Sequence, residues 1–67
     1  MEKTTFSQNL RELRKVNSIS QKELADKMSV SVKSISHWET KYTEPSLDQL
    51  ITLANIFDIT TDELLGR

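Results

Sequence analysis

Apolar residues recur along this chain at the three- and four-residue spacing of amphipathic helices. In the first such segment Phe6, Leu10 and Leu13 form one stripe, with charged residues around it. The segments with this pattern cover about residues 6–16, 21–28, 32–40, 47–57 and 61–65. Neither strand alternation nor an internal repeat is present. The pattern therefore predicts an all-α fold of five short helices around one core.

The predicted helix starts carry a shared signal. A hydroxyl residue followed three positions later by Gln or Glu forms a capping box, in which each side chain bonds the other's backbone N–H. This spacing occurs at Thr5–Gln8, Ser20–Glu23, Ser46–Gln49 and Thr60–Glu63. Ser31 starts the third helix without such a partner. Pro45 predicts a loop before the fourth helix, and Gly66 ends the last. In the fourth helix we expect one buried face, formed by Leu47, Leu50, Ile51, Ala54 and Phe57.

Residues 21–40 combine two helical patterns with a short turn. Leu24, Ala25 and Met28 form the apolar face of the first, and Val30, Ile35 and Trp38 fill the wedge between the two. Trp38 is therefore expected to anchor the core. The other face of the second helix keeps residues that the core does not need, namely Ser31, Val32, Lys33, Ser36 and His37. A helix held by one face and exposed on the other can enter the major groove of DNA, so we predict a helix-turn-helix motif.

Length and charge fit a small DNA-binding unit. We expect residues 1–67 to form a single domain. The net charge is −1, but residues 1–42 carry eight basic against five acidic residues, and residues 43–67 carry one against five. The basic part contains the helix at about residues 32–40, which is the candidate for reading the DNA bases. This placement suits a face directed toward phosphate. The absence of cysteine, of long apolar runs and of a signal-peptide pattern favours a cytoplasmic protein.

The whole pattern resembles the Xre-type, lambda-repressor-like helix-turn-helix domains, the class of phage repressors and Cro proteins. The resemblance covers about residues 5–65. It is carried by Leu10, Leu13, Arg14, Ser20, Gln21, Leu24, Ala25, Ile35, Trp38, Glu39, Pro45, Leu50, Leu53, Ala54, Phe57, Thr60, Asp62, Glu63, Leu64 and Leu65. Single elements of this set are weak signals, but the set at these spacings is specific.

The resemblance implies sequence-specific binding of double-stranded DNA by a transcriptional regulator, with repression as the expected mode. The implied base-reading residues are Val32, Lys33, Ser36 and His37. The implied phosphate-binding residues are Gln21, Ser31, Ser34, Thr40, Lys41 and Tyr42. Arg14 and Glu39 are implied to form a structural ion pair. The implied partner is an operator with two half-sites, bound by a homodimer that forms near the last helix, before or only upon DNA binding. Leu65, Ile59 and Phe57 are candidates for an apolar patch at that contact, or are used fully by the core of the monomer.

The side-chain chemistry agrees with these roles. Lys33 can donate to guanine O6 and N7, and Val32 can contact a thymine methyl group. His37 can donate or accept a hydrogen bond through its ring nitrogens. We expect no metal, cofactor, small-molecule ligand or membrane partner, since a lone histidine without cysteines is a poor metal site.

The chain departs from the family pattern where the family commonly has glycine. These positions are Ser18, Ser29, Lys41 and Asp58. Ser29 lies in the central turn, where a positive φ is often needed and a non-glycine residue costs on the order of 1 kcal/mol.

Other functions remain open at this stage. An enzyme is the weakest alternative, because the chain has one histidine, no cysteine and no glycine-rich phosphate loop. The same fold used as a protein–protein interaction module is the main rival. Within DNA binding, a phage repressor, a chromosomal repressor, an antitoxin and the DNA-binding part of a larger sensor all fit.

Overall fold

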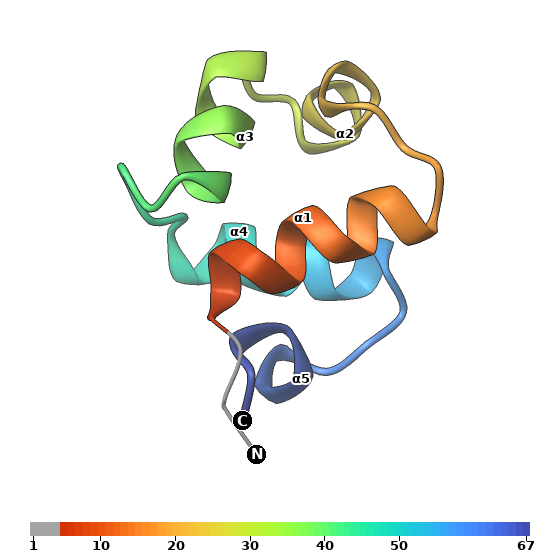
Figure 1. Ribbon diagram of the computed structural model, residues 1–67, viewed down its shortest axis with the longest axis vertical. Coiled ribbons are helices and arrows are strands. Elements are labelled where there is room, and N and C mark those ends of the chain that lie inside the picture. Colours follow the sequence, from red (N-terminus) through yellow and green to blue (C-terminus); the bar gives the residue numbers. More distant parts are fainter. Residues whose placement is uncertain (1–4) are drawn as a thin grey trace.

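The computed structural model describes residues 5–67, and five helices and no strand lie in that range. The helices are α1 (Phe6–Val16), α2 (Gln21–Met28), α3 (Val32–Glu39), α4 (Leu47–Ile56) and α5 (Thr61–Leu65). In Figure 1, α2 and α3 lie at one end, α1 and α4 cross the middle and α5 lies at the other end. The all-α prediction is confirmed, and the predicted bounds differ from the observed ones by one residue, at the ends of α3 and α4.

The predicted helix starts are confirmed as well. The boxes that begin at Thr5, Ser20, Ser46 and Thr60 all have both of their hydrogen bonds. Ser31 caps α3 by accepting from the Ser34 N–H, without a box. Each cap satisfies donors that the first turn of a helix leaves without partners.

The helices also share one kind of end. A residue in the left-handed conformation follows each helix: Ser18 (φ 55°), Ser29 (58°), Lys41 (66°), Asp58 (55°) and Gly66 (81°). The next residue then donates its N–H to the carbonyl five positions earlier, as Val30 does to Ala25 at 3.0 Å. This bond is one of the two that define the Schellman arrangement, and the second, donated by the left-handed residue itself, is present after α1, α2, α4 and α5. The four non-glycine residues stand at the positions where the family commonly has glycine. The positive φ expected at Ser29 is confirmed by its value of 58°.

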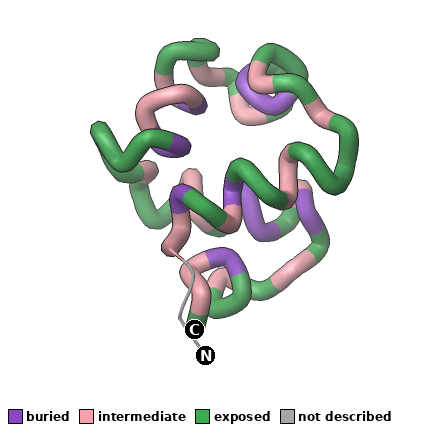
Figure 2. Tube along the Cα trace, viewed as in Figure 1, coloured by how far each residue is buried: buried purple, intermediate pink, exposed green. Residues whose placement is uncertain are grey.

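Each helix contributes one side chain that is wholly buried in the core. These are Leu10, Leu24, Ile35, Leu53 and Leu64, all 0% exposed. Ala25, Trp38, Ala54 and Phe57 complete the cluster, so the prediction of Trp38 as a core anchor is confirmed. Figure 2 shows the buried parts of α2 and α3 turned inward and their outer sides exposed.

The buried face of α4 differs from the prediction. Leu47 is 70% exposed and Ile51 is 44% exposed, while Leu53, which the predicted face omitted, is fully buried. Apolar residues at helical spacing occur twice on this helix, and both sets fit the periodicity. Packing against the other helices selects the set with Leu53 and turns Leu47 and Ile51 to solvent.

Candidate nucleic-acid interface

The last turn of α3 is fixed to α1 by a buried hydrogen bond. The Ser7 hydroxyl donates to the carbonyl oxygen of Trp38 at 2.6 Å, and Ser7 is 5% exposed. The carbonyls at the end of a helix have no partner within it, so Ser7 satisfies one of them from another helix. This contact was not predicted, because the two residues are 31 positions apart and no spacing rule relates them.

Arg14 and Glu39 join the same two helices through an ion pair. Arg14 Nε lies 2.7 Å from Glu39 Oε2 and Nη2 lies 3.2 Å from Oε1, so the guanidinium and the carboxylate meet in the forked geometry. Arg14 Nη1 also donates to the carbonyl of Ile19 at 3.2 Å. Glu39 is 5% exposed, and its hydrogen bond to Arg14 raises the pKa of the guanidinium. The pair is the one that the family resemblance implied, and it uses Glu39 for structure.

Gln21 is drawn into this cluster. Its side-chain Nε2 donates to Glu39 Oε1 at 3.2 Å, and the residue is half-buried. Gln21 occupies the first position of α2, where a backbone N–H has no partner within the helix. Its side-chain nitrogen therefore holds α2 to α3, while its backbone N–H is at a helix end that favours anions.

The candidate base-reading residues share one side of α3. Val32, Lys33, Ser36 and His37 occur at helical positions one, two, five and six, which a 3.6-residue repeat brings to the same face. Val32 is 43% exposed, Lys33 is exposed, and Ser36 and His37 are half-buried. The single acidic residue between positions 31 and 42 is Glu39, whose carboxylate is buried against Arg14. The exposed side chains of this face are thus neutral or basic.

The candidate phosphate-binding residues flank this face. At the start of α3 the hydroxyls of Ser31 and Ser34 lie 3.1 Å apart. At its end, the Thr40 hydroxyl donates to the carbonyl of Ser36 at 3.0 Å. Lys41 and Tyr42 are exposed in the following loop.

Tyr42 packs on one of the candidate readers. Its ring centroid lies 4.6 Å from that of His37, with the two rings tilted by 52°. The sequence placed His37 and Tyr42 in the same functional region but gave no sign that they touch, since the contact depends on the left-handed turn at Lys41.

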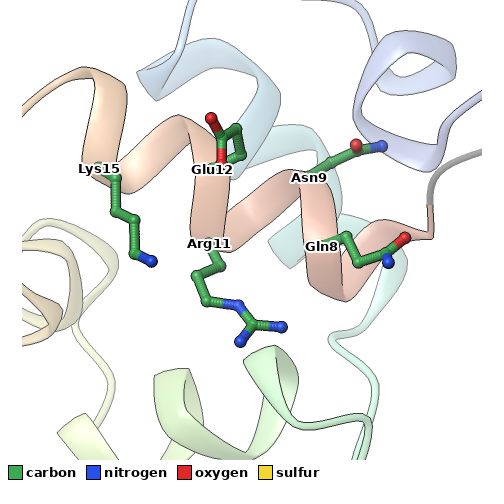
Figure 3. A pocket seen from close by; sticks show the side chains of 5 residues that line it. All are labelled: Gln8, Asn9, Arg11, Glu12 and Lys15. Carbon is green, nitrogen blue, oxygen red and sulfur yellow. The ribbon is translucent and has the colours of Figure 1, made fainter.

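A shallow hollow lies elsewhere, along the outer side of α1 (Figure 3). Its lining residues all belong to that single helix: Gln8, Asn9, Arg11, Glu12 and Lys15. Because all of these side chains come from one helix, the hollow does not bring together groups from different elements, as a binding or catalytic site would. Among residues 5–67, no three His, Cys, Asp or Glu residues are close enough to share a metal ion. In the same range, each helix is too short or too polar to cross a membrane.

Comparison with known proteins identifies the family. The model of the helix-turn-helix family matches residues 10–64, which is most of the chain. The chain belongs to this helix-turn-helix family. Its relatives include the HTH-type transcriptional regulator AnsR of Bacillus subtilis, with 43% identity over 58 residues. That match covers 87% of this chain and 50% of AnsR, so the helix-turn-helix chain spans about half the length of this relative.

Solved structures of related proteins have the same fold. The P22 c2 repressor, in complex with a synthetic operator, is 32% identical and superposes with a TM-score of 0.86 over 92% of this chain and 94% of the repressor. SinR, described as the master regulator for biofilm formation and solved in complex with DNA, is 28% identical. Its TM-score is 0.80, over 90% of this chain and 97% of SinR. The prediction of a lambda-repressor-like fold is confirmed.

Proposed function

We propose that this helix-turn-helix chain binds double-stranded DNA in a sequence-specific manner and regulates transcription, acting as a repressor. The observation that carries the proposal is the outward face of α3. It presents Val32, Lys33, Ser36 and His37 on a helix whose other side is fixed by Trp38 and by the Arg14–Glu39 pair. The similarity to AnsR and to two proteins solved with DNA supports the proposal.

In this proposal α3 lies in the major groove and its side chains contact base edges. Lys33 donates to guanine O6 or N7, and Val32 packs on a thymine methyl group. Ser36 and His37, one turn further along, reach the next bases. A rigid support matters here, because a reading side chain discriminates between bases only if its helix has a fixed position relative to the backbone.

Phosphate contacts fix that position. We assign them to the two ends of α3 and the first turn of α2, through Gln21, Ser31, Ser34, Thr40, Lys41 and Tyr42. For Gln21 the donors are the backbone N–H and the second hydrogen of the side-chain amide, since only one of the two amide hydrogens is bonded to Glu39. The starts of α2 and α3 both direct free N–H groups and the positive end of the helix dipole outward, where a phosphate oxygen binds well.

We further propose that residues 1–67 act as one DNA-binding unit in the cytoplasm and that two copies occupy half-sites about one helical turn apart. Of the three apolar residues considered for a contact between copies, Phe57 is 9% exposed and Ile59 packs on the core. Leu65 is half-buried and borders a small surface hollow with Phe6, Pro45 and Leu50. Leu65 is therefore the best supported candidate.

A mobility-shift experiment separates DNA binding from the main rival function. At low salt, the protein should retard a duplex of random sequence, because phosphate contacts do not depend on sequence. If no duplex is retarded at protein concentrations up to about 0.1 mM, the upper end of typical non-specific binding, DNA binding is wrong and the fold serves as a protein–protein interaction module.

Substitutions on α3 test the assigned reading face. Lys33→Ala and His37→Ala should each weaken binding to the preferred duplex by about 1–3 kcal/mol, as expected for the loss of a base contact. Lys15→Ala is the matched control, since it removes a lysine from the outer side of α1. A loss in the control as large as in Lys33→Ala would place the DNA elsewhere.

A further inference from the structure

The end of α3 differs from the ends of α1, α2 and α4 in one side chain. After α1, α2 and α4, the residue that follows the left-handed position is aliphatic and packs against the core: Ile19, Val30 and Ile59. After α3 this residue is Tyr42, which is 76% exposed. The backbone repeats the same turn, but the side chain at the apolar position stays on the surface, beside the proposed reading face.

The Tyr42 side chain contacts the residue that its backbone caps. Its N–H donates to the carbonyl of His37 at 2.9 Å, and its ring lies 4.6 Å from the His37 ring between centroids. In a Schellman end, the residue after the left-handed position often makes an apolar contact with the residue whose carbonyl it caps. Here that contact is made between two aromatic rings.

The loop holds Tyr42 in this place by several bonds. Lys41 has the positive φ that turns the chain back toward α3. The Thr40 hydroxyl donates to the carbonyls of Ser36 and His37 at 3.0 and 3.3 Å. The carbonyl of His37 also accepts from the Thr43 N–H at 3.4 Å. The backbone on both sides of Tyr42 is therefore tied to the last turns of α3.

We propose that Tyr42 is a positioning residue that orients the His37 ring for base reading and so sets the base preference at one position of the DNA site. The proposal rests on the proposed function, in which α3 reads the major groove. A histidine that is free on the surface loses rotamer freedom when it binds DNA, and this loss lowers affinity about two- to tenfold. A ring that is already held in place before binding avoids this loss. Tilted rings at this separation attract each other through their edges and faces.

The first test uses the protein without DNA. His37 is the single histidine of the chain, so its ring protons are identified in an NMR spectrum without ambiguity. Tyr42→Leu should move these resonances, because the neighbouring aromatic ring is removed, and Tyr42→Phe should keep them near their original positions. Val16→Ala is the control, since it alters another exposed apolar residue. Unchanged His37 resonances in Tyr42→Leu would overturn the proposal.

The second test is a double-mutant cycle with His37→Ala on DNA. Tyr42→Leu should weaken binding to the preferred duplex two- to tenfold and relax the preference at the base pair that His37→Ala relaxes. In the His37→Ala background, Tyr42→Leu should change that preference no further. Tyr42→Phe removes a phosphate donor but keeps the ring, so it should lower affinity for all sequences alike and retain the preference.

The outcomes distinguish the two proposals. If the effects of Tyr42→Leu and His37→Ala on base preference multiply independently, Tyr42 does not act through His37, and DNA binding by α3 still holds. If the protein binds no DNA, the proposed function is wrong. The proposed role of Tyr42 and His37 in base reading is then wrong as well, even if the NMR spectra show that their rings are in contact.

Discussion

Glu39 shows how one buried side chain sets the geometry of the proposed reading helix. Its carboxylate accepts from Arg14 on α1 and from Gln21 on α2, so three helices meet at one charged group. A buried carboxylate is stable only with such partners. The same burial withdraws from solvent the single acidic residue between positions 31 and 42. Stability and electrostatics thus depend on the same contact.

Removal of Arg14 should therefore destabilise the protein strongly. Arg14→Ala leaves the Glu39 carboxylate buried without its main partner, which typically costs about 3–5 kcal/mol of the free energy of unfolding. Arg11→Ala, on the exposed side of the same helix, is the matched control and should stay within about 0.5 kcal/mol. Thermal or urea unfolding measures both, and an unchanged midpoint for Arg14→Ala would show that the pair does not hold the fold.

A smaller effect is expected at Ser7. In Ser7→Ala the buried carbonyl of Trp38 loses its donor from α1, and an unsatisfied buried polar group costs about 1–3 kcal/mol. Ser36→Ala should cost much less, since no side-chain hydrogen bond of Ser36 is present among the described residues. Urea unfolding of the two variants compares them, and equal midpoints would mean that the Ser7 contact contributes nothing.

At the scale of the helix, local residues specify both where a helix starts and where it ends. Capping boxes start four helices, and a residue in the left-handed backbone conformation follows each of the five helices within residues 5–67. The starts use residues well suited to them, but four of the ends use residues that strain the backbone. Ser29, between α2 and α3, is the instance that affects the motif itself, since this turn sets the angle between the two helices.

Replacement of Ser29 by glycine should relieve that strain. Its φ of 58° costs a non-glycine residue on the order of 1 kcal/mol, and Ser29→Gly should recover part of it, because glycine also gains freedom in the unfolded chain. We expect a rise in Tm of a few degrees for a protein of this size. Ser36→Gly makes the same chemical change inside α3 and should lower Tm instead. A lower Tm in Ser29→Gly would contradict the account of this turn.

These local features explain why so much of the fold was predictable. Caps and left-handed turns depend on residues a few positions apart, and their spacing is visible in the chain. The buried face of α4 was predicted wrongly at Leu47 and Ile51, because two apolar sets share the same periodicity and only tertiary packing decides between them. The contacts of Ser7 with Trp38 and of Gln21 with Glu39 were not predicted either, because they join different helices and no spacing rule relates their positions. His37 and Tyr42 were both predicted as site residues, but their contact depends on the turn at Lys41.

For the whole molecule, the distribution of charge matters more than the net charge of −1. The segment with α1, α2 and α3 carries the excess of basic residues, and the segment with α4 and α5 carries the excess of acidic ones. In the proposed complex the basic part faces phosphate, while the acidic part is repelled by it. This asymmetry favours one docking orientation over its reverse.

The salt dependence of DNA binding should report this arrangement. The logarithm of the binding constant should fall linearly with the logarithm of salt concentration, because each neutralised phosphate releases counterions. Lys41→Ala should reduce the slope by about 1 if Lys41 contacts one phosphate, and should weaken binding to all sequences alike. Titrations at several salt concentrations give the slope, and a slope identical to that of the unaltered protein would exclude Lys41 from the phosphate contacts.

The reading role of α3 is tested most directly by binding selection from a pool of randomised duplex DNA. The unaltered protein should enrich a defined sequence, composed of two half-sites about one helical turn apart. Lys33→Ala and His37→Ala should each lose the preference at different base pairs, and Lys41→Ala should enrich the same sequence with lower affinity. Enrichment of the unaltered sequence by both Lys33→Ala and His37→Ala, or of no sequence by the unaltered protein, would contradict the assignment of α3 as the reading helix.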